Sequence, residues 1–146
     1  MSDAKDVKNY SGGCHCGQVR FDVTADLNKV YSCNCSICVK RGALWAFVPP
    51  ESFALRAGAE ALADYQFNKK VIHHLFCGQC GVGSFSQGIA PSGNEMVAVN
   101  VRCLDGVDLA ALTLTLVDEK SGSVAYWRQW KRRISAGFDA LFGLFP

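Results

Sequence analysis

Short stretches of alternating apolar and polar residues are the main pattern along this chain. In residues 18–24, Gln-Val-Arg-Phe-Asp-Val-Thr, apolar and polar side chains alternate, as in a strand with one buried face. Further short segments are rich in Val, Phe, Leu and Tyr and are bounded by Gly, Pro, Asn or Asp. They cover residues 29–33, 44–48, 62–67, 71–76, 83–87, 95–101 and 112–117. The pattern predicts a mainly β fold with mostly antiparallel strands.

The C-terminal stretch has a different periodicity. Its apolar residues recur at steps of three and four, which is the spacing of one face of an α-helix. We expect a C-terminal amphipathic helix that packs on the sheet or joins copies of the chain in a homo-oligomer. Its basic residues also allow contact with nucleic acid or an acidic membrane surface, but a net charge of only +2 does not favour this. The apolar positions are Val124, Trp127, Trp130, Ile134, Phe138, Leu141 and Phe145.

Length and composition limit the class of protein. The 146 residues are enough for one domain with a hydrophobic core, and 49% hydrophobic residues argue against disorder. No run of eighteen apolar residues is present, so we expect no membrane span. The first six residues are polar and lack the apolar core of a signal peptide. We therefore expect one domain, residues 1–146, in the cytoplasm.

Eight cysteines add chemistry to this picture. Cytosolic thiols are kept reduced, so a dense set of cysteines there indicates metal ligands or catalysis rather than disulfides. Pairs separated by one or two residues can point their sulfurs at a common metal ion, most simply zinc. Seven of the eight form three such clusters: Cys14-His15-Cys16, Cys33-Asn34-Cys35-Ser36-Ile37-Cys38 and Cys77-Gly78-Gln79-Cys80.

The spacing within the clusters suggests how the sulfurs converge. Alternate side chains of an extended strand share a face, so Cys14 and Cys16 can point at one metal, and so can Cys33 and Cys35. The segment from Cys77 to Cys80 resembles a zinc knuckle, in which glycines relieve crowding around the sulfurs. Seven thiolates divide into four and three. A structural zinc takes four protein ligands, whereas a catalytic zinc keeps one position open.

Spacing alone does not fix which clusters share a metal. The simplest assignment joins Cys14 and Cys16 to Cys77 and Cys80, because a site of four ligands would tie two distant segments together. The remaining triplet, Cys33, Cys35 and Cys38, would be the open site in one loop. We expect Cys103 to be a small buried residue. The alternative is that Cys103 closes the second site as a fourth ligand.

Four motifs occur together in this chain: Gly12-Gly-Cys14-His-Cys16-Gly17, Cys33-Asn-Cys35-Ser-Ile-Cys38, Phe76-Cys77-Gly-Gln-Cys80-Gly81 and Val99-Asn-Val-Arg102-Cys-Leu-Asp105. With them, residues 10–117 resemble the glutathione-dependent formaldehyde-activating enzyme family, which includes centromere protein V-like proteins. The resemblance implies a β-tent-like fold with two zinc ions per chain. It places a structural zinc on Cys14, Cys16, Cys77 and Cys80, and a catalytic zinc on Cys33, Cys35 and Cys38. Residues 118–146 do not match the family pattern.

The resemblance also implies an activity, carbon–sulfur lyase chemistry that joins glutathione as co-substrate to formaldehyde and gives S-hydroxymethylglutathione. Three thiolates would leave zinc with a formal charge of about −1, which favours exchange with an incoming thiol over activation of water. Lys40 and Arg41 follow the triplet directly and are candidates for binding the carboxylates of glutathione, and Arg102 is a third.

Two further interpretations stay open at this point. His73 and His74 lie on opposite faces of a predicted strand, so at least one of them should be an ordinary surface or hydrogen-bonded residue. The alternative to an enzyme is a non-enzymatic module, in which the metals stabilise a surface that binds glutathione or another partner. A thiol-responsive second zinc would distinguish the enzyme from the module.

Overall fold

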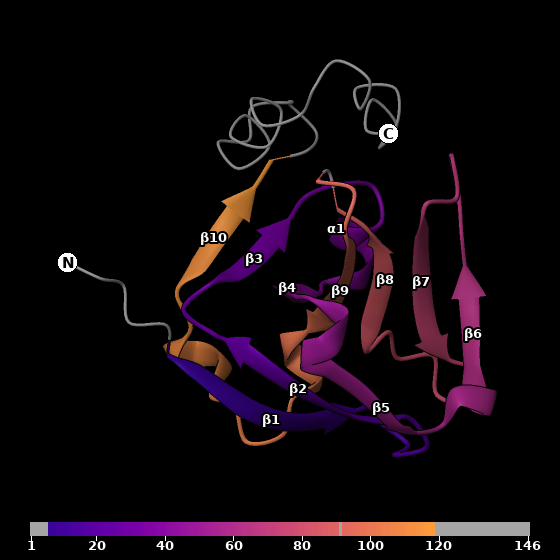
Figure 1. Ribbon diagram of the computed structural model, residues 1–146, viewed down its shortest axis with the longest axis horizontal. Coiled ribbons are helices and arrows are strands. Elements are labelled where there is room, and N and C mark those ends of the chain that lie inside the picture. The colour runs from indigo at the N-terminus through magenta and orange to yellow at the C-terminus, as the bar shows by residue number, and fades with distance from the viewer. Residues whose placement is uncertain (1–5, 91, 119–146) are drawn as a thin grey trace.

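The computed structural model describes residues 6–90 and 92–118. This part of the chain forms two β-sheets. The smaller sheet has the strand order β1-β2-β5, with β1 Val7–Gly13, β2 Arg20–Asp26 and β5 Phe53–Ala57. In Figure 1 these strands form the base of the molecule, while the larger sheet rises from it with β10 and β3 on one side and β7 and β6 on the other.

The larger sheet has seven strands in the order β10-β3-β4-β9-β8-β7-β6. All of its pairs are antiparallel except β10 and β3, which run parallel. The bounds are β3 Val30–Cys33, β4 Leu44–Val48, β6 Leu62–Tyr65, β7 Ile72–Cys77, β8 Phe85–Ile89, β9 Glu95–Asn100 and β10 Leu114–Val117. The prediction of a mainly β fold is confirmed, and each of the eight predicted segments overlaps a strand. The strands β1 and β5 were not predicted.

The helical segments in the described part of the chain are short. The α-helix α1 is Cys38–Arg41, and 3-10 turns occupy η1 Pro50–Ser52, η2 Ala59–Ala61, η3 Val101–Cys103 and η4 Leu109–Ala111. No helix in the described part of the chain is long and apolar enough to span a bilayer. The predicted C-terminal amphipathic helix, and the homo-oligomer that it would form, lie outside the described residues.

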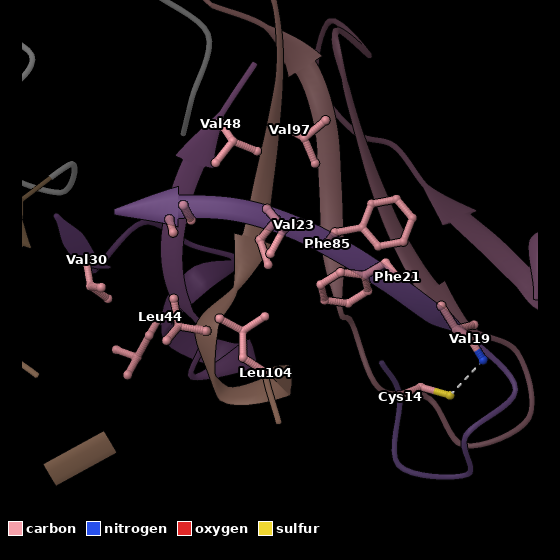
Figure 2. Close-up of a cluster of buried hydrophobic side chains, with 14 of the residues drawn as sticks. Cys14, Val19, Phe21, Val23, Val30, Leu44, Val48, Phe85, Val97 and Leu104 are labelled. Carbon is pink, nitrogen blue, oxygen red and sulfur yellow. Dashed lines mark hydrogen bonds between the residues drawn. The ribbon is translucent and has the colours of Figure 1, made fainter. Parts of the chain in front are cut away.

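The hydrophobic core lies between the two sheets. Figure 2 shows Phe21 of β2 facing Phe85 of β8, and their ring centroids are 6.0 Å apart. Phe53 of β5 completes this aromatic group, with ring centroids 5.3 Å from Phe21 and 4.7 Å from Phe85. Valines of both sheets surround it, including the fully buried Val99. Burial of each such side chain contributes about 1.5–3 kcal/mol to the free energy of unfolding, so the contact between the two sheets is a main source of stability.

The opposite face of the seven-stranded sheet carries different side chains. Strand register places His74 of β7 opposite Ser86 of β8, Ser86 opposite Ala98 of β9, and Ala98 opposite Phe47 of β4. Because neighbouring residues in register share a face, these side chains form one row across the sheet. Phe85, next to Ser86 in the sequence, points to the core instead. The second face therefore offers polar and aromatic groups for a site.

Candidate metal centres and active site

Four cysteines converge from two turns that are far apart in the sequence. The Sγ atoms of Cys14, Cys16, Cys77 and Cys80 all lie within 4.8 Å of one another. The Sγ atom of Cys16 is 3.5 Å from that of Cys14 and 3.7 Å from that of Cys77. A tetrahedron of sulfurs at the usual zinc–sulfur distance has edges of about 3.8 Å. These four thiols therefore fit a closed zinc site.

Turns, rather than strands, bring these sulfurs together. The strand β1 ends at Gly13, so Cys14 and Cys16 are not in an extended strand as predicted. Gly17 and Gly81 each follow the second cysteine of a pair, and both have left-handed backbones, with φ of 81° and 78°. The N–H groups of these glycines donate to the carbonyls of Cys14 and Cys77, at 3.3 and 2.8 Å. Glycine is needed there because other residues adopt this conformation only with strain.

Backbone amides favour the thiolate form of two of these cysteines, Cys14 and Cys80. The N–H of Val19 donates to the Cys14 Sγ atom over 3.3 Å, and Figure 2 marks this bond. Burial raises the pKa of Cys14, but the Val19 amide and the neighbouring thiols outweigh it, so that pKa lies below its usual value. The backbone N–H groups of Cys16 and Val82 lower the pKa of Cys80 to about 6. Zinc binds thiolates, so these amides prepare the site for the metal.

The cysteine triplet is local to one loop. Cys33 is the last residue of β3, Cys35 lies buried in the following turn, and Cys38 begins α1. Their Sγ atoms all lie within 4.8 Å of one another. The strand ends before Cys35, so the predicted extended geometry does not hold here either. The turn brings the three sulfurs to one point instead.

Hydrogen bonds favour a thiolate at one of the three cysteines in the metal-free chain. The N–H of Cys35 donates to the Cys33 Sγ atom over 3.4 Å, and the indole Nε1 of Trp45 donates to the Cys38 Sγ atom over 3.2 Å. Hydrogen bonds from the thiols of Cys33 and Cys38 lower the pKa of Cys35 to about 2. These interactions also raise the pKa of Cys33, so in the metal-free chain the negative charge is held mainly on Cys35. This donor set fits zinc, which prefers thiolate ligands.

The triplet has three ligands and not four among the described His, Cys, Asp and Glu residues. Cys103 belongs to neither sulfur group, and its Sγ atom lies 4.0 Å from the Gly83 carbonyl oxygen. Burial is the main cause that raises the pKa of Cys103, as expected of a thiol that packs rather than binds metal. The structure therefore does not bring Cys103 to the second site as a fourth ligand.

The three candidate cations near the triplet differ in their surroundings. Lys40 is exposed, and the Arg102 Nε atom donates to the Gly42 carbonyl over 2.9 Å. Arg41 is half-buried, and its Nη1 atom is buried with no hydrogen-bond partner in the described part of the chain. Burial lowers the pKa of Arg41, and the Coulombic interaction with the neighbouring Cys38 opposes this shift. Arg41 therefore has an unused donor close to the triplet.

The two adjacent histidines occupy opposite faces of β7, as predicted. His73 is exposed and its Nδ1 atom lies 2.6 Å from the Asp64 carboxylate. His74 is buried, and its ring stacks on Phe67 with centroids 5.2 Å apart. Burial, helped by the charge of Arg41, lowers the pKa of His74 to about 4. His74 is therefore a neutral imidazole at neutral pH.

Ser86 is a residue that the sequence analysis did not single out. It lies directly opposite His74, is only 4% exposed, and its Oγ atom has no hydrogen-bond partner in the described part of the chain. In the sequence, nothing distinguishes this serine from other polar residues of a predicted strand. Only the register of β7 and β8, together with burial, identifies it.

Comparisons with known proteins agree with this geometry. A family model described as "Glutathione-dependent formaldehyde-activating enzyme" matches residues 9–115. The chain is also similar to a protein of Rhodobacter sphaeroides with a crystal structure, at 34% sequence identity and a TM-score of 0.64. That alignment covers 72% of this chain and 99% of the Rhodobacter chain.

Proposed function

This chain belongs to the glutathione-dependent formaldehyde-activating enzyme family, and on that basis we propose that it is a carbon–sulfur lyase. Its reaction would join glutathione to formaldehyde, or to a similar small aldehyde, and give S-hydroxymethylglutathione. The observation that carries this proposal is the cysteine triplet, because three thiolates without a fourth ligand among the described residues leave a place for a substrate sulfur.

The proposed reaction requires only a thiolate and an aldehyde held close to it. A zinc ion on three thiolates would supply a position that keeps a fourth sulfur in its thiolate form. The glutathione sulfur forms a bond to the aldehyde carbon, and the electron pair of the C=O π bond moves to the oxygen. That oxygen gains a proton, which balances the proton lost from the thiol. The main contribution of the site is to bring thiolate and aldehyde together.

Each residue near the triplet has a proposed role. Cys33, Cys35 and Cys38 would hold the catalytic zinc, and Trp45 steadies Cys38 through its indole N–H. Lys40 and Arg41 would bind carboxylates of glutathione. The exposed Lys40 suits long-range attraction. The Nη1 atom of Arg41, which has no hydrogen-bond partner in residues 6–90 and 92–118, suits a direct contact.

We assign the second zinc a structural role on Cys14, Cys16, Cys77 and Cys80. This group has four ligands, which leaves no open position for a substrate, and two of them, Cys14 and Cys77, belong to the hydrophobic core. We also place the protein in the cytoplasm, because seven cysteines that serve as metal ligands require a reducing compartment and because glutathione is abundant there.

The test of this proposal is Cys35→Ser in the full chain. We expect the protein to keep its fold and to lose one of two bound zinc ions. The protein-dependent rate of S-hydroxymethylglutathione formation should fall at least about 100-fold. Native mass spectrometry counts the zinc, and NMR with ¹³C-formaldehyde follows the product above the uncatalysed background.

Cys103→Ser is the matched control, because Cys103 lies outside both sulfur groups. Unchanged metal content and turnover in Cys35→Ser would overturn the assignment. Two zinc ions that never exchange with glutathione, with no turnover in the unsubstituted chain, would instead favour the non-enzymatic module.

A further inference from the structure

Two buried polar atoms without a hydrogen-bond partner, and one buried histidine beside them, lie on the second face of the large sheet or near it. The Nη1 atom of Arg41 and the Oγ atom of Ser86 have no hydrogen-bond partner among residues 6–90 and 92–118. His74, only 8% exposed, lies directly opposite Ser86 and interacts electrostatically with Arg41. A buried donor without a partner costs about 1–3 kcal/mol, so such a group in a folded protein calls for an explanation.

Gly83 explains how the guanidinium reaches this position. It lies two residues before β8, and a Cβ atom at that position would come within 3.0 Å of the Arg41 Nη1 atom. A larger residue would therefore push the guanidinium away. The absence of a side chain at Gly83 lets a long cation from α1 lie against the segment that leads into Ser86. The three polar groups thus come from α1, β7 and β8.

The charges around this group select the class of ligand. Arg41 is a cation without an ion-pair partner in the described residues, while His74 and Ser86 are neutral donors at neutral pH. One cation with two neutral donors complements a group of charge −1 with two acceptor oxygens, which describes a carboxylate. The aromatic rings of Tyr65 and Phe67 cover the side of His74, with centroids 6.4 and 5.2 Å from the imidazole. This cover would strengthen hydrogen bonds within the site.

We propose that Arg41, His74 and Ser86 together form a carboxylate-binding site that selects thiol substrates with a free carboxylate. This inference rests on the proposed function, because it identifies which end of the thiol substrate the site binds. Arg41 supplies the charge, and His74 and Ser86 are specificity-determining donors from the opposite strands. Thiols that lack a carboxylate bind more weakly, because Arg41 and Ser86 then remain without the partner that the carboxylate supplies.

The test uses a probe that cannot act as a thiolate. S-methylglutathione has both carboxylates and a blocked sulfur, and its dimethyl ester has neither carboxylate charge. We expect isothermal titration calorimetry on the zinc-loaded full chain to show the acid binding at least about 10-fold more tightly than the ester. Arg41→Met should reduce this ratio to near 1, and Ser86→Ala and His74→Phe should each reduce it by about 3-fold.

Arg56→Met is the matched control. Arg56 is an exposed arginine of the smaller sheet that pairs with Asp22 at 2.8 Å, so its removal should leave the ratio unchanged. Gly83→Ala keeps every charge but crowds the guanidinium, and it should lower the ratio with the fold intact by circular dichroism.

Two results would overturn the inference: equal binding of acid and ester by the unsubstituted chain, or an unchanged ratio in Arg41→Met and Ser86→Ala. The proposed function has its own failure. A chain that discriminates acid from ester but neither exchanges thiols at the triplet nor forms S-hydroxymethylglutathione keeps the carboxylate site and loses the lyase assignment. A chain that forms S-hydroxymethylglutathione but binds acid and ester equally keeps the lyase assignment and loses the carboxylate site.

Discussion

The four-cysteine group and the cysteine triplet use the same ligand in different settings. Cys14 and Cys77 are members of the hydrophobic core cluster, and their group joins two turns from distant parts of the chain. The triplet lies in the single loop from Cys33 to Cys38, and none of its members belongs to that cluster. Both groups have the same kind of ligand, but they connect different parts of the chain. A metal site that joins distant segments stabilises the fold, whereas a metal site within one loop remains available for chemistry.

The largest expected effect separates the two groups by stability. Cys77→Ser removes a fully buried ligand from the four-cysteine group, so we expect loss of one zinc ion and at least about 3 kcal/mol of the free energy of unfolding. Cys35→Ser should cost no more than about 1 kcal/mol, because its loop contributes little to the core. Denaturant unfolding followed by circular dichroism, with zinc counted in each variant, measures both.

Equal losses of stability in Cys77→Ser and Cys35→Ser would break the comparison, because the triplet would then also stabilise the fold. The Cys103→Ser variant shows how much a cysteine outside both groups contributes on its own.

A smaller effect concerns the hydrogen bond from Trp45 to the triplet. Trp45→Phe keeps an aromatic ring but removes the indole N–H that lies 3.2 Å from the Cys38 Sγ atom. We expect zinc to be held about 10-fold more weakly at the triplet and unchanged at the four-cysteine group, because removal of such a partner typically lowers metal affinity. Competition with a chromophoric chelator resolves the two zinc ions. A single, unaltered release curve would contradict the role of Trp45.

The smallest effect is a pH dependence from His74, on the strand that also ends in Cys77. Its pKa is about 4 in the folded chain and about 6.5 when unfolded, so as pH falls the unfolded chain takes up the proton first. His74 therefore contributes stability above pH 6.5 that is lost as pH falls toward 4. Between pH 7.5 and 5.5, the native chain should lose about 1 kcal/mol more unfolding free energy than His74→Gln.

Zinc release at low pH affects the native chain and His74→Gln alike, so the difference between them isolates the histidine. Parallel pH profiles for the two proteins would show that His74 is not buried as a neutral group. Each profile comes from chemical unfolding at fixed pH, with zinc in excess.

Local patterns were enough to predict most of the sheet strands. Eight segments alternate or concentrate apolar residues, and each forms a strand. The strand β1 was missed because it is mostly polar and exposed and ends in two glycines. The strand β5 was missed because it is short and Phe53 and Leu55 are its only large apolar residues. The parallel pairing of β10 with β3 depends on residues 84 positions apart, such as Leu114 and Val30, which no local pattern encodes.

The candidate sites divide in the same way. Cysteine spacing predicted the three clusters, because ligands one to two residues apart can converge locally. Which clusters share a site followed from the simplest division into four and three and from the family resemblance, and the structure brings together the same two groups. The spacing did not predict that turns, rather than strands, bring the sulfurs together. The polar group of Arg41, His74 and Ser86 depends on strand register and on the space left by Gly83, so the sequence could suggest only Arg41, from its position after the triplet.

The separation between the two halves of the four-cysteine group has a consequence for protein synthesis. Cys16 leaves the ribosome 61 residues before Cys77, which is about 3–12 s at ordinary elongation rates. During this interval the first pair of thiols has no protein partner to complete the site. A newly made chain would therefore first have only half of the ligands of this zinc site. Its folding yield would depend on the zinc that is available when the second pair emerges.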